Sequence, residues 1–417
     1  MSARMSTPGR GRLALVLAPL ISCAQPAAAQ RTVTAIHPEG IDGRVLERRI
    51  EIRIAADGAM SRSERRVVEH LTEHSVGTYG DPILVHDAGS QRLRIETART
   101  TAHGGATLDT PPFAINELTP PDMAAAPEMA GIRATVVSHV GIEPGARAEL
   151  AYVVQDTEPP TTGFAAGEVA LRWTLPVERF ELRIVVPADA VFEHACAGCS
   201  LAPVATREGE SRVYVWTAQR LAPIDWFEVS DQMGLPWDGL EGPRIAFSTA
   251  GSWQRAARPL VDAAATAPAD GVARKARALA ADAAGPEQAA EVLQAFVAEG
   301  VATVPMPPGL PFRPPATPEA VLGRSYGTPV EKALLLASML SAAGVQSWPV
   351  LVAGGRGIAP AVPQLDQFRE AWVAVGRDGE PSWWLPVDRR ATFAASAFPG
   401  GRYALHLREP LAPRQHP

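Results

Sequence analysis

The alternation of apolar and polar residues between about residue 32 and residue 245 is typical of short β-strands. Residues 48–54, 133–140 and 149–154 carry β-branched and aromatic side chains with partial alternation, as expected for strands with one buried face. Turn signals such as Asp57-Gly58 separate these segments. The pattern predicts an antiparallel β-sandwich over residues 32–245. Further strands are predicted at residues 168–175, 179–186 and 211–217.

Helical periodicity replaces this pattern after Trp253, where the chain becomes rich in alanine. A nearly continuous apolar run from Gly327 to Val345 predicts a helix buried on all sides, which ends at Gly344. The predicted fold class is therefore α+β, with a second domain over residues 250–395 and a C-terminal tail over residues 396–417. The other elements predicted here are helices at 253–265, 271–283 and 286–299, and strands at 348–353, 370–376 and 382–387.

The first 29 residues have the three-part order of a secretory signal peptide. A basic stretch is followed by an apolar run from Leu13 to Ile21, which is too short to span a bilayer, and by small residues ending at Ala29. Cys23 offers an alternative, because the residues before it also fit a lipoprotein cleavage box. We therefore expect a periplasmic or secreted protein, or one anchored to the outer membrane by lipid at Cys23.

Charge and composition narrow the classes of partner. The formal net charge of −6 becomes −9 once residues 1–29, with three arginines and no acids, are removed. An acidic chain without a basic block is a poor ligand for nucleic acid, and we expect contact with a membrane only through lipidation. With 46% hydrophobic residues in 417, the chain can form more than one core.

The first half resembles a known family. Asp57-Gly58, Tyr79-Gly80, the segment 93–98 before Gly104-Gly105, and Gly145 opening a strand with Tyr152 occur in a recognisable order. This order is similar to that of a β-rich domain of unknown function that commonly precedes a transglutaminase-like core in exported bacterial proteins. The resemblance covers roughly residues 35–240.

Residues 250–395 resemble that transglutaminase-like, papain-related core. The family places a cysteine nucleophile at the start of the buried helix, where the helix dipole favours the thiolate, a histidine base on a following strand and an aspartate on the next. The matching positions here are Thr328, Glu370 and the displaced Asp388. The last cysteine is Cys199, so no small shift restores the triad. We expect no catalytic residues and no cofactor, and a binding or scaffolding role toward an envelope protein or a peptide-like ligand.

Two interpretations of Thr328 remain open. The tetrapeptide Thr328-Pro329-Val330-Glu331 is a capping box, in which the threonine caps the helix and the glutamate reaches back. The alternative is a hydrolase or acyltransferase with an active site rebuilt around Thr328, Glu370 and Asp388. A carboxylate is a weak base for a hydroxyl group, so the structural interpretation is favoured.

Cys196 and Cys199 are the other residues that invite chemistry. Their spacing favours a disulfide at the tip of a hairpin in an oxidising compartment, with free thiols or a redox pair as alternatives. His194 adds a third possible ligand, but no fourth is visible, so we expect no metal site.

Overall fold

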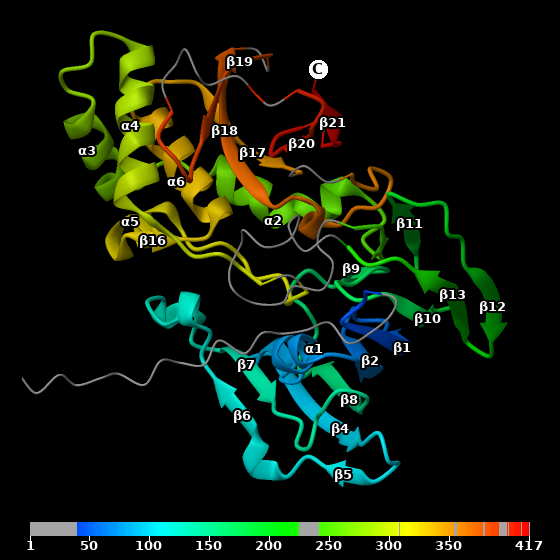
Figure 1. Cartoon of the computed structure of the whole chain (residues 1–417). Helices are drawn as coiled ribbons and strands as arrows, with labels where there is room; N and C mark the ends of the chain where they lie inside the picture. The colour runs from blue at the N-terminus through cyan, green and yellow to red at the C-terminus, as the bar shows by residue number, and fades with distance from the viewer. Residues whose placement is uncertain are drawn as a thin grey trace, which may run out of the picture. The chain divides into compact units, whose positions relative to one another are not determined.

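The computed structural model describes residues 40–416, apart from 225–241, 308, 354–356, 378–379, 392–397, 399 and 410. The predicted signal peptide and Cys23 lie outside the described residues. Residues 35–417 form one compact unit. Its described part has a mixed α+β fold that is rich in strands and contains six α-helices (Figure 1).

The first half is built on an eight-stranded sheet with the order β12-β13-β10-β1-β2-β8-β4-β5. The turn at Asp57-Gly58 joins β1 to β2, and Gly58 has a φ of +89° that a side chain would rarely adopt. All pairs in this sheet are antiparallel except β1 with β10. The strands are β1 Gly43–Ile54, β2 Met60–His70, β4 Gln91–Thr101, β5 Thr107–Asp109, β8 Arg147–Asp156, β10 Val177–Pro187, β12 Val204–Glu208 and β13 Ser211–Leu221.

Two three-stranded sheets accompany the large one, with the orders β3-β7-β6 and β11-β14-β9. A short helix, α1, follows β2, and Thr72 caps it by accepting a hydrogen bond from the amide of Ser75. The elements are α1 Glu73–Tyr79, β3 Ile83–Asp87, β6 Ile115–Leu118, β7 Ile132–Val137, β9 Ala166–Ala170, β11 Glu193–Ala197 and β14 Arg244–Ser248. Short 3-10 helices lie at Pro112–Ala114, Pro121–Met123, Pro127–Met129 and Leu365–Gln367.

Helix α6 lies at the centre of the second half, in contact with α2 to α5 and with β17 and β18 (Figure 1). Ten of its residues are buried, which agrees with the apolar run in the sequence. Two two-residue strands, β15 and β16, precede it, and a sheet with the order β19-β18-β17-β20-β21 follows. The elements are α2 Trp253–Ala265, α3 Asp270–Leu279, α4 Pro286–Gly300, β15 Ala302–Thr303, α5 Pro318–Arg324, β16 Tyr326–Gly327, α6 Pro329–Ala342, β17 Ser347–Val352, β18 Glu370–Arg377, β19 Glu380–Pro386, β20 Tyr403–His406 and β21 Arg414–Gln415.

The end of the chain differs from the tail expected at residues 396–417. Strand β20 pairs with β17 and with β21, which makes both part of the five-stranded sheet. Leu405, Leu407 and Leu411 are buried in the same apolar cluster as α6. A strand of four residues such as β20 is too short to be recognised in the sequence. Its two buried residues, Ala404 and Leu405, anchor this end of the chain to the core.

Contacts along β14 join the two halves. Ser248 donates a hydrogen bond to the carbonyl oxygen of Pro363 at 2.8 Å. Ala246 on β14 packs with Ala359 and Val362 in one small apolar cluster. A second cluster joins the halves away from β14, where Val304 packs with Met123 and Ile132. No described helix has the length and apolar composition required to cross a membrane.

Candidate functional site

The start of α6 contains the capping box that the sequence indicates. The Thr328 side chain accepts a hydrogen bond from the amide of Glu331 at 3.3 Å, and Glu331 Oε2 accepts one from the amide of Thr328 at 2.8 Å. Glu331 also accepts a hydrogen bond from the amide of Ala316 and forms an ion pair with Arg324. Thr328, at the position expected for a nucleophile, therefore takes part in a group of contacts that hold the start of α6.

Removing the Thr328 side chain is expected to cost about 1 kcal/mol of unfolding free energy, because an unmet helix amide replaces a capped one. Thr328→Ala and the cap-preserving Thr328→Ser should be compared by urea denaturation. Serine should retain most of the stability. A loss of equal size in both variants would contradict the capping role.

Glu370 and Asp388 are also held in local contacts. Glu370, at the start of β18, accepts hydrogen bonds from Arg402 at 2.6 Å and from the indole of Trp372 at 3.0 Å. Asp388 follows β19 and pairs with its neighbour Arg389 at 3.0 Å. No hydrogen bond or ion pair between described residues joins Thr328, Glu370 and Asp388 to one another. These contacts do not form a nucleophile and base pair.

Lys332, one turn further along α6, is a residue that the sequence reasoning missed. It is fully buried, and its Nζ donates a hydrogen bond to Thr303 Oγ1 at 2.9 Å. Burial lowers the pKa of Lys332 to about 8, although the nearby Asp388 acts in the opposite direction. The signal was present in the sequence, since a single lysine interrupts a helix predicted to be buried on all sides.

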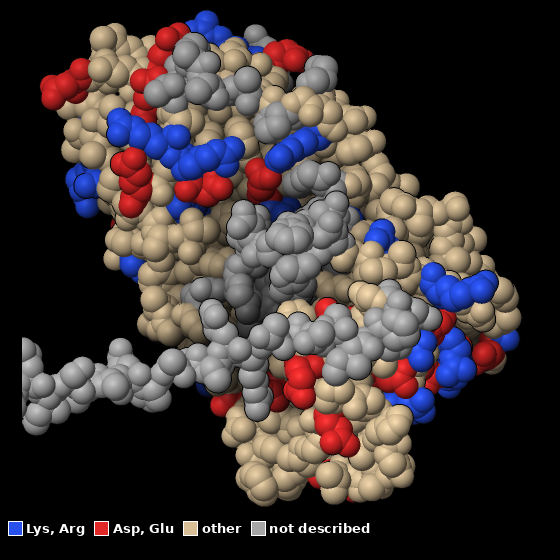
Figure 2. Space-filling model, viewed as in Figure 1, with Lys and Arg blue, Asp and Glu red and all other residues tan. Residues whose placement is uncertain are grey.

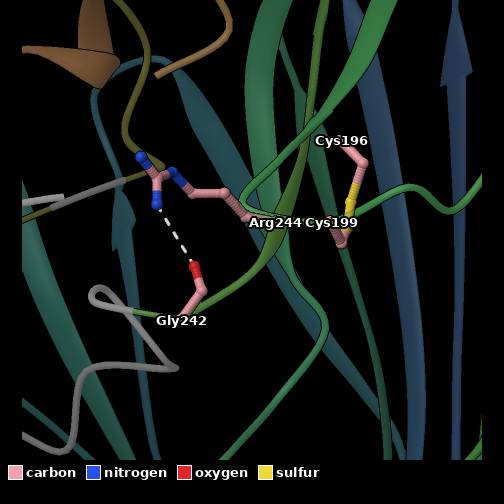
Figure 3. Close-up of a disulfide and its surroundings, with 4 residues drawn as sticks. All are labelled: Cys196, Cys199, Gly242 and Arg244. Carbon is pink, nitrogen blue, oxygen red and sulfur yellow. Dashed lines mark hydrogen bonds between the residues drawn. A yellow bond between two sulfur atoms is a disulfide. The ribbon is translucent and has the colours of Figure 1, made fainter. Parts of the chain in front are cut away.

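Cys196 and Cys199 are joined by a disulfide at the end of β11 (Figure 3). Their Cα atoms lie 5.3 Å apart, and Gly198 between them has a φ of +75°. Arg244 lies opposite Ala197 on β14 and donates a hydrogen bond to the carbonyl oxygen of Gly242 at 3.2 Å. The disulfide packs against the core of the large sheet, in surroundings that suit a structural crosslink.

His194 lies among aromatic rings instead of metal ligands. Its ring contacts those of Phe192, Tyr214 and Trp216, with centroids 5.2–5.5 Å apart. Burial lowers its pKa. Within the described ranges, no three His, Cys, Asp or Glu side chains gather closely enough to hold a metal ion.

A cavity of about 300 Å³ lies against one face of the large sheet. Strands β1, β2 and β8 contribute alternate residues to it, because every second side chain of a strand points to the same face. Further lining residues come from β9, β14, the segments 78–85, 160–165, 309–312 and 364–366, and single positions such as Gln91 and Trp173. The walls combine apolar side chains with charged ones of both signs, and a concave site of this size can hold a small polar ligand.

Buried charges lie on this face of the sheet. Glu64 accepts hydrogen bonds from Arg48 at 2.9 Å, from Arg62 at 2.8 Å and from the hydroxyl of Tyr152 at 3.1 Å. Burial acts to raise the pKa of Glu64, but the charges of Arg48, Arg62 and Arg66 outweigh it and hold the pKa far below its usual range. Glu64 is therefore ionised, and it fixes the position of two arginines.

Charges of both signs are interspersed on the face of the molecule shown in Figure 2. Basic and acidic side chains lie next to one another on this face. Exposed ion pairs of the described chain include Arg94 with Glu96 and Arg99 with Asp109. The described residues on this face therefore show no large patch of a single charge sign.

Comparisons with known proteins give a family match over part of the chain. Residues 56–225 match the model of a family described as a domain of unknown function with a solved structure, DUF3857, which covers less than half of the chain. A search of curated proteins found no match. Among solved structures, the chain is similar to a protein from Parabacteroides distasonis ATCC 8503 described as a putative protease. The TM-score is 0.75 at 21% identity, over 88% of this chain and 70% of that one. At this identity the likeness shows a shared fold alone.

Other solved structures are only distantly similar. Two structures of an M1 zinc metallopeptidase from Deinococcus radiodurans have TM-scores of 0.25 and 0.27 at 12% and 11% identity. They cover 49% and 72% of this chain and 42% and 63% of those chains. Scores this low carry no argument about fold or activity.

Proposed function

We propose that this chain is a non-catalytic, transglutaminase-like recognition protein of the bacterial cell envelope. In this proposal a β-sandwich precedes a papain-related core, and the protein binds or scaffolds a peptide-like ligand or an envelope protein. The central helix α6 followed by the antiparallel strands β17, β18 and β19 supports the core assignment. Residues 1–29, with Cys23 as the alternative lipidation site, support the location.

The observation that carries the proposal is the use of the expected catalytic positions for structure. The Thr328 hydroxyl caps α6, while Glu370 is paired with Arg402. A nucleophile needs a base within hydrogen-bond reach, and the Thr328 hydroxyl has only the backbone amide of Glu331 as its described partner. The fold is then retained for binding, as occurs when function moves to another site on the same scaffold.

The test combines capture with an activity assay. The mature protein should retain peptides, peptidoglycan fragments or proteins from an envelope extract in a saturable manner, and a broad amidase and transamidase assay should show no turnover. A second chain prepared with Thr328→Ala should behave identically. Turnover that depends on Thr328 would overturn the proposal.

A second candidate function is favoured by the contact between Lys332 and Thr303. In this alternative the chain is a hydrolase or acyltransferase with a rebuilt active site. A neutral Lys332 amine would accept the proton of Thr303 while the hydroxyl oxygen attacks an acyl carbon, and the ammonium so formed would return that proton to the amine or alcohol that leaves. Water would then release the acyl group from Thr303 in a hydrolase, or a second nucleophile would accept it in an acyltransferase. The exposed position of Thr303 and the lowered pKa of Lys332 support it.

Paired variants separate the two candidates. If the second candidate holds, Thr303→Ala and Lys332→Met should each abolish turnover, whereas Thr328→Ala should leave it within the range expected from lost stability. If the chain is a recognition protein, none of the three variants should alter the rate in the same assay.

A further inference from the structure

The cavity on the large sheet has two side chains of opposite charge at diagonal positions. Arg62 on β2 lies opposite Val154 on β8, and Asp156 is two residues further along β8. Both side chains line the cavity, so they lie on the same face of the sheet. Diagonal neighbours in an antiparallel pair are about 7–8 Å apart. A single small molecule can therefore reach both groups.

Asp156 lacks a cationic partner among the described residues. Its carboxylate accepts hydrogen bonds from the amide of Met60 at 2.8 Å and from the Gln91 side chain at 3.0 Å. Burial raises the pKa of Asp156, while these two hydrogen bonds act in the opposite direction. A ligand ammonium group would supply the missing charge, because a half-buried carboxylate gains most from an opposite charge at short range.

Two further groups in the cavity lack hydrogen-bond partners. Gln364 is only 1% exposed, and its Oε1 has no hydrogen-bond donor within the described part of the chain. The Nε of Arg62 is likewise buried without an acceptor there, although another nitrogen of that guanidinium donates to Glu64. Buried polar atoms are almost always satisfied in native proteins, so an unmet acceptor and an unmet donor in one cavity point to a missing polar ligand.

The unmet groups define the chemistry of that ligand. A simple cation at Asp156 would leave the Arg62 donor unmet, and a simple anion at Arg62 would leave the Asp156 carboxylate without an opposite charge. The apolar lining includes Met60, Phe164 and Trp173, which suit an aliphatic or aromatic side chain. An α-amino acid carries an ammonium group, a carboxylate and such a side chain on one carbon.

We propose that this cavity binds a free amino acid or dipeptide with an apolar side chain, its ammonium group at Asp156 and its carboxylate at Arg62. This inference rests on the proposed recognition of peptide-like ligands and names both the ligand class and its site. The cavity volume of about 300 Å³ accommodates a ligand of this size and lies at the lower end of the range for small-ligand sites.

Calorimetric titration of the full-length mature protein with leucine, phenylalanine and Leu-Leu tests the inference. Leucinamide, which lacks the carboxylate, and N-acetyl-leucine, which lacks the ammonium group, serve as probes. Each modification should weaken binding by about 10- to 100-fold, as expected for the loss of one charge-assisted hydrogen-bond contact. Equal affinity for leucine and both analogues would overturn the inference.

Two variants locate the site by their selectivity. Asp156→Asn should remove the preference for leucine over N-acetyl-leucine, and Arg62→Gln should remove the preference for leucine over leucinamide. Asp109→Asn and Arg99→Gln change an exposed ion pair outside the cavity lining and should leave both preferences intact. If a cavity variant does not fold, the analogues on the unchanged protein still give a result.

The outcomes also separate this inference from the proposed function. Absence of binding by any amino acid or dipeptide up to about 10 mM, a concentration that would detect even millimolar affinity, would mean that water fills the cavity. Saturable capture of longer peptides in that case would overturn the inference alone and leave the recognition function standing.

Discussion

Replacing Glu64 with glutamine is expected to lower the free energy of unfolding by about 3–5 kcal/mol. The Glu64 side chain is fully buried, and the substitution would remove a negative charge that pairs with Arg48, whose side chain is 2% exposed, and with Arg62. Loss of one partner from a buried ion pair has an effect of this size because the remaining charge stays desolvated. Urea denaturation at pH 7 measures it.

Glu96→Gln is the matched control for this change. Glu96 pairs with Arg94 on the solvent side, where the two side chains are 42% and 72% exposed. Exposed pairs contribute about 0–1 kcal/mol. A loss of less than 1 kcal/mol in Glu64→Gln would show that water or other polar groups compensate the charges of the arginines.

The same substitution has a defined dependence on pH. Because the folded-state pKa of Glu64 lies below its ordinary value of 4.5, the carboxylate contributes its full stabilisation above about pH 4.5. That contribution decreases as the pH falls toward the folded-state pKa. The difference between the unchanged protein and Glu64→Gln should therefore be constant near neutrality and become smaller below about pH 4.5.

Replacing Lys332 with methionine is expected to raise the free energy of unfolding at pH 7 by about 1–3 kcal/mol. The amine is fully buried and forms one described hydrogen bond, to an exposed threonine. Exchanging a buried charge for an apolar side chain of similar length removes its desolvation cost. Thr303 can then form its hydrogen bonds with water.

The pH dependence checks the origin of this gain. The pKa of Lys332 is about 8 in the folded chain against 10.5 ordinarily, so the unfolded chain binds more protons between these values and stability rises with pH in that interval. The advantage of Lys332→Met should be complete below about pH 8 and absent above about pH 10.5. Lys275→Met, at an exposed position on α3 where the ammonium lies 4.8 Å from the centroid of the Phe296 ring, should change stability by less than about 1 kcal/mol. A gain for Lys332→Met that does not vary with pH would show that packing, not charge, causes it.

Local patterns in the sequence predicted the second half of the fold more closely than the first. The apolar run 327–345 corresponds to α6 at Pro329–Ala342, and the strand expected at 370–376 corresponds to β18 at Glu370–Arg377. Helical burial and capping are encoded within a few residues of each position. The order of the strands in the large sheet depends instead on partners distant in sequence, which no local pattern specifies.

The candidate sites also differ in whether a local pattern in the sequence could locate them. Thr328 was located from its own tetrapeptide, and the structure contains the capping box there. The cavity could not be located from the sequence, because Arg62, Asp156 and Gln364 come together only through the register of β2 with β8 and through a segment some two hundred residues later. The sequence shows Lys332 as a charged residue within the apolar run of α6, but no local pattern connects it with its partner Thr303.

The parallel pairing of β1 with β10 has a consequence for how the chain is made. Residues 43–54 are synthesised first, yet one of their two neighbours spans residues 177–187. Loop closure over such a separation is slow, and an unpaired strand edge can associate with other chains. A ribosome adding about 5–20 residues per second needs several seconds to reach β10. Throughout that interval the edge of β1 that later pairs with β10 stays open to association with other chains.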